Sequence, residues 1–453
     1  MVSRVEQKNS RRKFVRRALG LTAAGGVGVT AALVVQPGAD AADTFSSPYT
    51  VNVKDFGAKG DGSTDDSKAI RTAITEALSG RKSGVVQKEV YFPPGNYKVT
   101  QKDTFMWSPT NGQADQIFGL RFRGGGPRVT NIDFVTSFGA TSDPRENNLI
   151  TAAVRLRYTY FEDMSFRSTN PNNRFAYFWS RDDDDTNLLY PAYGHGQNQY
   201  FVYRNVEWRG QWDRVIGIDG DQQANNNSEH HFLFCSTDTV SKYTDAFLHC
   251  GITNPSANPQ QNQFLNFFME SCNFALAGGN FFRFDRGGSI NVIGGSWSMV
   301  GTEPACYFYM PSPNGELSAT RLHVSGVRFE PKMGTRQRII DCAWGQGNVT
   351  FTSCSDMAAV QVPSAAAHNY HRYVAANGRI PIVRYQDCVL AGHHMVDSGT
   401  TRLASGKVIY EGCRFYHTTT AVGGASSTAF LRSSAAPARY AFRDSWATPD
   451  VSG

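Results

Sequence analysis

Outside its N-terminus, the sequence has little net charge and no long apolar run. Residues 1–41 hold seven lysines and arginines against two acidic residues, and so account for +5 of the formal net charge of +6. A nearly neutral remainder offers no electrostatic footprint for nucleic acid. The eight cysteines also include no C-x-x-C pair, so their spacing predicts no metal site. We therefore expect no nucleic-acid partner, no metal ligand set and no evident cofactor.

The N-terminus combines a basic stretch, an apolar stretch and a small-residue site. Ser10–Phe14 reads SRRKF and is followed by a glycine- and alanine-rich run, Leu19–Val35, and by Ala39–Ala41. This order predicts a signal peptide over 1–41, and the paired arginines indicate twin-arginine export of a folded chain. A retained membrane anchor is the alternative, although the run is short and diluted by glycine and threonine. We expect a secreted or periplasmic mature chain beginning near Ala42, without membrane contact.

The first part of the mature chain predicts a strand, a short helix and a second strand. Thr50–Val53 alternates like a strand, and Ser63 or Thr64 can serve as the N-cap of a helix. Glu89–Phe92 predicts another strand, and Pro93–Tyr97 a turn. The helix has one apolar face at helical spacing, made by Ala69, Ile70, Ala73, Ile74, Ala77 and Leu78. We expect this amphipathic helix to pack its apolar face against another part of the fold.

Past residue 120, short apolar runs alternate with glycine, asparagine and aspartate, and a strand, small-turn and aromatic plan repeats. Successive repeats lie 24 to 42 residues apart, which suits the coils of a parallel solenoid with loops of varying length. A propeller or a sandwich of hairpins would instead contain many two-residue turns. The equivalent positions are expected at residues 164, 206, 236, 272, 296, 327, 354, 388 and 413.

The cysteines follow the same repeat. Cys272, Cys354, Cys388 and Cys413 occupy one repeat position, and Cys235 lies beside it. A disulfide framework is one interpretation, because the chain is expected to be exported and the count is even. Export of a folded chain from a reducing cytoplasm favours the other, in which the thiols are free and buried as small core residues.

Several N-terminal motifs resemble the pectate lyase superfamily. Val53–Gly62 reads VKDFGAKGDG, Thr64–Asp66 reads TDD, and Val90–Tyr97 reads VYFPPGNY. The chain resembles the rhamnogalacturonase and epimerase-like, polygalacturonase-related members. The resemblance implies an all-β fold, a right-handed parallel β-helix with a short N-terminal capping α-helix. We expect the capping module over 42–100 and the coils with the C-terminal end over 101–453.

A second periodic position suggests a polar ladder along the coils. Asp219, His249, Asp285 and Tyr309 lie thirteen residues after four of the repeat positions, and Asp341 lies fourteen after a fifth. Equivalent residues of adjacent coils are about 4.8 Å apart, so Asp219 and Asp285 would be separated by roughly 9–10 Å, with His249 between them. That separation is near the upper end for the two carboxylates of an inverting glycosidase. The alternative is that both aspartates cap turn backbone before glycine.

The expected catalytic residues are therefore Asp219, Asp285 and His249. Tyr309 and Asp341 on the ladder are expected to bind substrate, with flanking help from Asp221, Lys242, Asp245 and Arg286. Since the expected ladder itself contains no lysine or arginine, β-elimination is harder to assign than hydrolysis. Lys242 or Arg286 remains a candidate base for elimination.

Three other features are weaker signals. Gly194–Gly196 reads GHG, as in polygalacturonase-type hydrolases, but no Asn-Thr-Asp precedes it. The aspartates of Asp182–Asp185 offer oxygen ligands for calcium, and a solvated loop is the alternative. Exposed aromatic rings would favour sugar binding, and the candidates are Trp208, Trp212, Trp297 and Trp344. The alternative is that they belong to the core, as most aromatics of a repeat do, and the sequence does not decide between the two.

We expect a secreted carbohydrate-active enzyme, a hydrolase or a lyase, that cleaves an acidic, pectin-like or related polysaccharide in a groove along the β-helix. The alternative function is a non-catalytic surface or adhesion protein that binds glycans on the same face. A trimer like that of a tailspike is a third possibility, and the sequence does not decide between monomer and trimer.

Overall fold

The computed structural model describes residues 49–105, 117–152, 156–180, 198–220, 227–253, 266–285, 288–312, 321–331, 337–356, 369–375, 377–391, 393–397, 405–416, 431–433 and 440–447. These residues are almost entirely β, with one α-helix, α1 (Ser67–Ser79), and one 3-10 turn, η1 (Val53–Phe56). The predicted all-β class is confirmed. Within the described ranges, no helix is long and apolar enough to cross a membrane. The predicted signal peptide over 1–41 lies outside them.

The strands form two ladders, which we call ladder A and ladder B. Both contain the long strand β11 (Gln199–Gly220), whose first half pairs in ladder A and whose second half pairs in ladder B. Ladder A also contains β1 (Thr50–Asn52), β2 (Asp61–Asp65), β3 (Glu89–Tyr91), β4 (Gly95–Val99), β5 (Ile117–Phe118), β6 (Arg121–Arg123), β7 (Thr130–Phe134), β9 (Leu156–Ser168), β12 (Ser228–Leu233), β13 (Ser236–Thr237), β15 (Phe267–Leu276), β17 (Ser289–Met299), β19 (Arg321–Ser325), β20 (Arg328–Glu330), β22 (Asn348–Thr352), β23 (Ser355–Asp356), β25 (Arg379–Gln386), β26 (Val389–Ala391), β28 (Ser405–Glu411), β29 (Arg414–Tyr416), β31 (Tyr440–Arg443) and β32 (Trp446–Ala447). Ladder B also contains β8 (Asn148–Ala152), β10 (Arg174–Ser180), β14 (Lys242–Cys250), β16 (Gly278–Phe284), β18 (Ala305–Met310), β21 (Gln337–Cys342), β24 (Asn369–Val374), β27 (His393–Asp397) and β30 (Leu431–Ser433).

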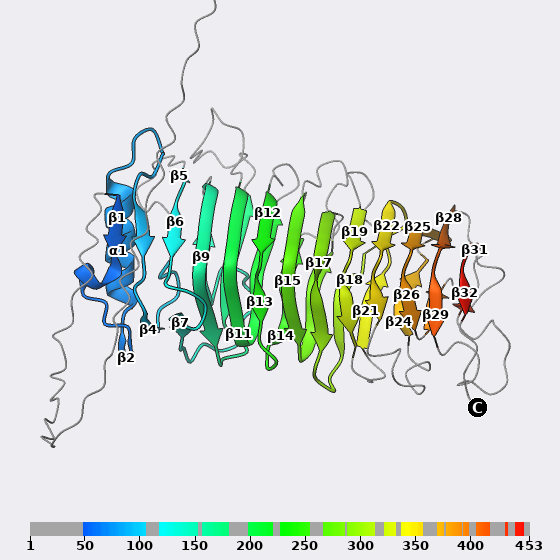
Figure 1. Cartoon of the computed structure of the whole chain (residues 1–453). Helices are drawn as coiled ribbons and strands as arrows, with labels where there is room; N and C mark the ends of the chain where they lie inside the picture. Colours follow the sequence, from blue (N-terminus) through cyan, green and yellow to red (C-terminus); the bar gives the residue numbers. More distant parts are fainter. Residues whose placement is uncertain are drawn as a thin grey trace, which may run out of the picture. The chain divides into compact units, whose positions relative to one another are not determined.

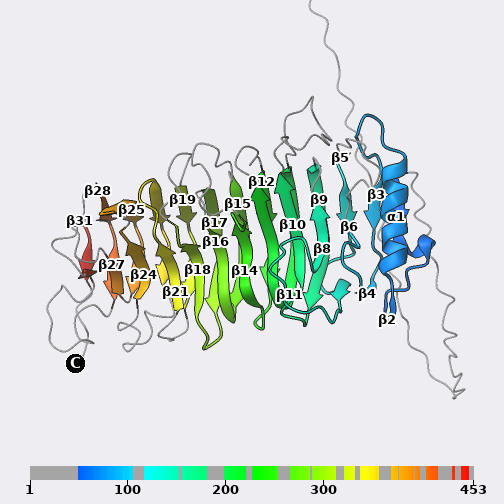
Figure 2. The same cartoon turned by 180° about the vertical axis from the view of Figure 1, so that it is seen from behind.

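Pairing between the named strands is parallel throughout the described ranges. In ladder B, β14 pairs with β16, β16 with β18 and β18 with β21, so each passage of the chain adds one strand beside the previous one. We call one passage through ladder A and ladder B a coil. Figures 1 and 2 show the strands side by side in chain order from two opposite directions. Parallel neighbours cannot be joined by two-residue hairpins, which excludes the hairpin sandwich.

Helix α1 forms on the predicted apolar face but begins later than predicted. Ile70, Ala73, Ile74, Ala77 and Leu78 are buried, whereas Ala69 is only partly buried. Asp66 is the N-cap residue, while Ser63 and Thr64 lie in β2. The prediction was wrong because Asp61 accepts hydrogen bonds from the backbone N–H groups of residues 63 and 64, which keeps this segment out of the helix. The predicted turn Pro93–Tyr97 also ends early, since Gly95 already begins β4.

The repeat positions are confirmed with two corrections of one residue. Strand pairing places Ser236 opposite Asn273 and Ser296 opposite Arg328. The row that contains Cys272 therefore continues through Cys235 and Gly295, and the predicted positions 236 and 296 were wrong. A slip of one residue moves a side chain to the other face of a strand, and the sequence repeat is too loose in these two segments to exclude it. The row runs through Met164, Val206, Cys235, Cys272, Gly295, Val327, Cys354, Cys388 and Cys413.

All eight cysteines are free and buried, which confirms the free-thiol interpretation. The five cysteines of the row each lie with Sγ at 3.2–3.5 Å from a backbone carbonyl of the preceding coil: Cys235, Cys272, Cys354, Cys388 and Cys413. A thiol is a weak donor and a compact apolar group. The row therefore fills the core and also places a weak donor against strand carbonyls of the preceding coil.

The structure decides between the two interpretations of the tryptophans in favour of the core. Trp208, Trp212, Trp297 and Trp344 are fully buried, and the rings of the first three pack against phenylalanines or tyrosines of other coils. Trp297, for example, contacts Phe274 and Phe308 with ring centroids 5.2 and 5.5 Å apart. Inward-facing aromatics at each coil stack along the core, and burial of such large rings is a major source of stability.

Candidate active site on the outer face of ladder B

A row of polar side chains crosses ladder B, but it differs from the predicted ladder. Strand pairing puts His249 opposite Gly217 on one side and Arg283 on the other. The row then continues through Tyr309, Asp341 and Arg372. Asp219 and Asp285 lie two positions further along their strands, so His249 is not between them in one row.

The thirteen-residue offset failed because the connection from ladder A to ladder B varies in length. In one coil the residue of the polar row is Arg283, 11 residues after Cys272. In the preceding coil it is His249, 14 residues after Cys235. The pairing of β11 with β14 also shifts by a bulge between Trp212 and Arg214. No single spacing can therefore align the two rows.

His249 is the centre of a partly buried network of ionisable side chains. Its Nδ1 lies 2.7 Å from Asp245 Oδ2, and its Nε2 lies 3.2 Å from Asp285 Oδ2. The guanidinium of Arg283 donates to both carboxylates, at 2.9 Å to each oxygen of Asp285 and 3.1 Å to Asp245. Arg214 donates to Asp245 from the neighbouring strand, at 3.2 Å. We call these five residues the His249 cluster.

The cluster holds both of its carboxyl groups ionised. Burial alone would raise the pKa of Asp245, but the hydrogen bond from His249 and the nearby positive charges outweigh it and lower the pKa. Burial likewise opposes ionisation of Asp285, and hydrogen bonds from His249 and Arg283 lower its pKa. Neither carboxyl group keeps a proton at neutral pH.

Asp219 is fully buried and makes a different set of contacts. Its Oδ2 accepts from the hydroxyl of Tyr177 at 3.1 Å, and from the backbone N–H and hydroxyl of Thr253 at 2.9 and 2.7 Å. These bonds tie the end of β11 to the segment after β14 and to β10, instead of capping the turn that follows Asp219 itself.

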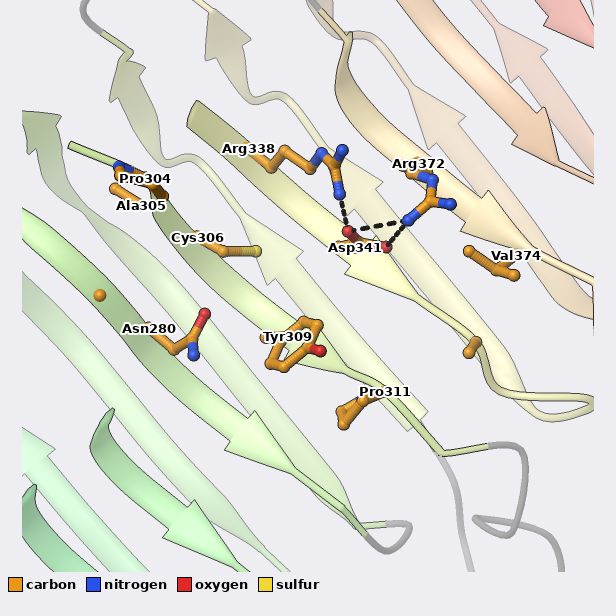
Figure 3. Close-up of a pocket in the computed structure, with 12 residues that line it drawn as sticks. Asn280, Pro304, Ala305, Cys306, Tyr309, Pro311, Arg338, Asp341, Arg372 and Val374 are labelled. Carbon is orange, nitrogen blue, oxygen red and sulfur yellow. Dashed lines mark hydrogen bonds and ion pairs between the residues drawn. The ribbon is translucent and has the colours of Figure 1, made fainter. Parts of the chain in front are cut away.

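A surface cavity of about 540 Å³ adjoins the cluster further along the row. Its polar lining includes Tyr309, Arg338, Asp341 and Arg372, with Asn280 at one side (Figure 3). Asp341 accepts hydrogen bonds from both arginines. Arg338 donates one N–H to Oδ2, and Nη1 of Arg372 lies 3.4 Å from each carboxylate oxygen. Burial, and then the charge of Arg372, lowers the pKa of Arg338. We call this the arginine pocket.

The other predicted residues are dispersed or undescribed. Lys242 forms an exposed ion pair with Glu303 at 2.7 Å and lies seven residues before His249 on β14. Asp221, Arg286, and the segments Asp182–Asp185 and Gly194–Gly196 lie outside the described residues.

The sequence prediction missed the arginines of the row. The sequence pattern predicts no lysine or arginine in the polar row. That prediction was wrong, since Arg283 and Arg372 are both part of the row. A signal was present in Phe281–Asp285, where Phe282 and Phe284 are buried and Arg283 between them faces outward. Alternation in a strand places neighbours on opposite faces.

Residues 50–157 match the family described as rhamnogalacturonase A/epimerase, pectate lyase-like. The predicted resemblance to the pectate lyase superfamily is confirmed. The similarity to curated proteins is also confined to a short segment of the chain. A probable glucan endo-1,3-beta-glucosidase of Arthroderma benhamiae is 52% identical over 54 residues, and alginate lyase 7 of Azotobacter vinelandii is 54% identical over 52. These matches cover 11% and 12% of this chain, but only 6% of each relative.

Solved structures align over more of the chain at low identity. The A-module of a mannuronan C-5 epimerase from Azotobacter vinelandii covers 88% of this chain and is itself covered over 99%, with 13% identity and a TM-score of 0.37. The catalytic unit of an alpha-1,3-glucanase from Streptomyces thermodiastaticus aligns over 89% of this chain and 70% of its own, with 12% identity and a TM-score of 0.38.

Proposed function

We propose that this protein is an exported right-handed parallel β-helix enzyme that cleaves an acidic polysaccharide by β-elimination on the outer face of ladder B. The parallel ladders and the pectate lyase-like segment support the β-helix, in which α1 caps the first coil. The basic N-terminus supports removal of residues 1–41 after twin-arginine export. The arginine pocket beside the His249 cluster is the observation that carries the proposed reaction.

The pocket suits a sugar that carries a carboxylate. Each guanidinium has five N–H donors, so Arg338 and Arg372 can bind a sugar carboxylate in addition to Asp341. Planar guanidinium groups match carboxylates in two parallel hydrogen bonds. The side chains of Arg338 and Arg372 are 33% and 27% exposed, so an incoming polymer can reach them.

Elimination fits the charges better than hydrolysis does. An inverting hydrolase needs one carboxylic acid that keeps its proton near neutral pH. Burial opposes ionisation of Asp285, but hydrogen bonds from His249 and Arg283 outweigh it and lower the pKa of this carboxyl group. Asp219 is fully buried and accepts three hydrogen bonds from Tyr177 and Thr253. We therefore assign Asp219 a structural role, in which its hydrogen bonds hold the end of β11 in place.

In the proposed reaction, the arginines neutralise the sugar carboxylate and so acidify the neighbouring C–H bond. Tyr309 lines the pocket, and in its deprotonated form its phenol oxygen removes the proton of that C–H bond. The electron pair forms a C=C bond while the C–O bond to the glycosidic oxygen breaks, and Tyr309 then gives the proton to the leaving oxygen. The His249 cluster positions Arg283, the neighbour of Tyr309 in the row.

A non-catalytic glycan-binding or adhesion protein remains the alternative function, because the same pocket would bind an acidic sugar without cleaving it. The two differ in their dependence on Tyr309. Binding needs the arginines, whereas cleavage also needs the phenol hydroxyl.

The deciding experiment incubates the mature chain, from Ala42, with a panel of polyuronic and neutral polysaccharides, with and without calcium. Ultraviolet absorbance of the new C=C bond, conjugated with the carboxylate, reports elimination, and reducing ends report any cleavage. We expect absorbance and reducing ends together, loss of both in Tyr309→Phe, and no loss in Tyr200→Phe, whose ring is exposed on ladder A. Reducing ends without absorbance would overturn elimination in favour of hydrolysis. Saturable binding without either signal would favour the adhesion alternative.

A further inference from the structure

The arginine pocket has small apolar side chains along one side. Pro311, Ala343 and Val374 line the same cavity, and each comes two residues after a member of the polar row. They are neighbours in adjacent coils, because β18 pairs with β21 and β21 with β24 up to the residue before each of them. All three are partly exposed, and Figure 3 shows Pro311 beside Tyr309 and Val374 beside Asp341. We call Pro311, Ala343 and Val374 the apolar row.

The apolar row offers no hydrogen bond to a ligand. Asp285, bound by Arg283, lies beside one end of it, and Asp397, bound by Arg372, lies beside the other. Between these aspartates, the three side chains contain neither a donor nor an acceptor. A sugar hydroxyl that became covered by them would lose its water partners without a replacement, which is unfavourable. The apolar row therefore favours a sugar position that carries no free hydroxyl.

The distance between the polar row and the apolar row is comparable to the width of a sugar ring. Side chains two residues apart on a strand are roughly 6.6 Å apart. A sugar whose carboxylate is bound by Arg372 would therefore place the opposite edge of its ring over Val374. Neighbours in adjacent coils are roughly 4.8 Å apart, so the three residues extend over roughly 10 Å.

We propose that the apolar row binds the acetyl groups of an O-acetylated acidic polysaccharide. This preference rests on the proposed function and narrows its substrate class. An acetyl ester removes the hydroxyl donor and adds a methyl group that the apolar row can cover. It also leaves the sugar carboxylate charged, as the arginines require, whereas a methyl ester of the carboxylate would neutralise it. One extra methyl-sized group in an apolar pocket changes the relative kcat/KM by about tenfold or more.

An unsubstituted sugar is the competing occupant, since its C–H groups can also pack on small apolar side chains. In that case an acetyl group would have no site of its own and would gain nothing. The two cases differ in the effect of removing the acetyl groups from one polymer.

The test uses the mature chain, from Ala42, and two forms of the same polymer. Polymannuronate and polygalacturonate are each O-acetylated chemically, and half of each preparation is then deacetylated with mild alkali. Ultraviolet absorbance gives kcat/KM for both forms, and calorimetric titration of Tyr309→Phe gives their affinities without cleavage. We expect both quantities to be about tenfold more favourable for the acetylated form.

Two substitutions that add a hydroxyl to the apolar row are the informative variants. Val374→Thr keeps the size of the side chain, and Ala343→Ser adds one oxygen. Each should reduce the preference for the acetylated form to roughly twofold or less, while the rate on the deacetylated form stays unchanged because the arginines are intact. The matched control is Val129→Thr, at an exposed valine between β6 and β7, which should keep the tenfold preference.

The outcomes separate the apolar row from the reaction. Equal kcat/KM and equal affinity for the two forms, or a preference for the deacetylated form, would overturn the acetyl site and leave elimination intact. Tighter binding of the acetylated form without new absorbance would overturn elimination and support the acetyl site. No saturable binding of either form of either polymer would overturn both.

Discussion

At the scale of single residues, the stability of the fold at acidic pH is expected to depend on two aspartates of the His249 cluster. The pKa values of Asp245 and Asp285 are lowered against burial by His249 and the arginines. A carboxyl group with a lowered folded-state pKa stabilises the fold above its unfolded pKa of about 3.9, and that stability is lost as pH falls through the folded value.

We therefore expect Asp285→Asn to lower the free energy of unfolding by roughly 3 kcal/mol at pH 7, because it breaks a buried ion pair. The deficit should shrink below about pH 4, where the wild type loses the same contribution. Urea unfolding at several pH values measures both effects. Glu303→Gln, at an exposed pair with Lys242, should change stability by less than about 1 kcal/mol. A deficit that does not depend on pH would contradict the linkage.

The arginine pocket makes a residue-scale prediction about activity. Hydrogen bonds to charged groups contribute about 1.5–3 kcal/mol, so Arg372→Ala should reduce kcat/KM on an acidic polysaccharide by roughly ten- to a hundredfold. Steady-state kinetics checks this. Arg384→Ala is the matched control, because Arg384 is exposed on ladder A and should leave the rate unchanged. Equal losses in both variants would indicate general charge attraction instead of a defined pocket.

At the scale of strands and turns, local sequence patterns predicted the elements but not their alignment. The α1 face and the cysteine row follow from helical and coil spacing, and both are present. The polar row could not be aligned from sequence, because the connection before His249 and the one before Arg283 differ in length. Buried and exposed arginines also look alike in sequence, which is why Arg283 was missed.

Two glycines in successive coils of ladder A, one inside β17 and one between β19 and β20, test this alignment. Gly295 has φ +100° and an added Cβ would lie 2.0 Å from the carbonyl oxygen of Cys272, whereas Gly326 has φ +65° and open space around it. Gly326→Ala should cost only the conformational penalty, roughly 1–2 kcal/mol. Gly295→Ala should cost more than about 4 kcal/mol, because backbone of the adjacent coil must move. Equal losses in denaturant unfolding would contradict the close approach of the two coils.

At the scale of the whole molecule, the repeat and the N-terminal motifs predicted the all-β class and the resemblance to the pectate lyase superfamily. The sequence could not predict which residues meet between ladders. Asp356, His371 and His394 come from different strands of two coils, and only the pairing of β24 with β27 brings the two histidines together. Contacts across the core depend on the register of every intervening coil.

Parallel coils that each contact only their neighbours should respond locally to damage. Helix α1 packs its apolar face against the first strands, and Ile74 is 1% exposed at its centre. Ile74→Ala should cost about 2–5 kcal/mol through the cavity it creates. If stability is nearly a sum over neighbouring coils, hydrogen exchange should quicken in β1 to β4 and stay unchanged in β24 and β27. Thr72→Ala, on the exposed side of α1, should alter neither region, and faster exchange along the entire chain in Ile74→Ala would show that the coils unfold as one cooperative unit.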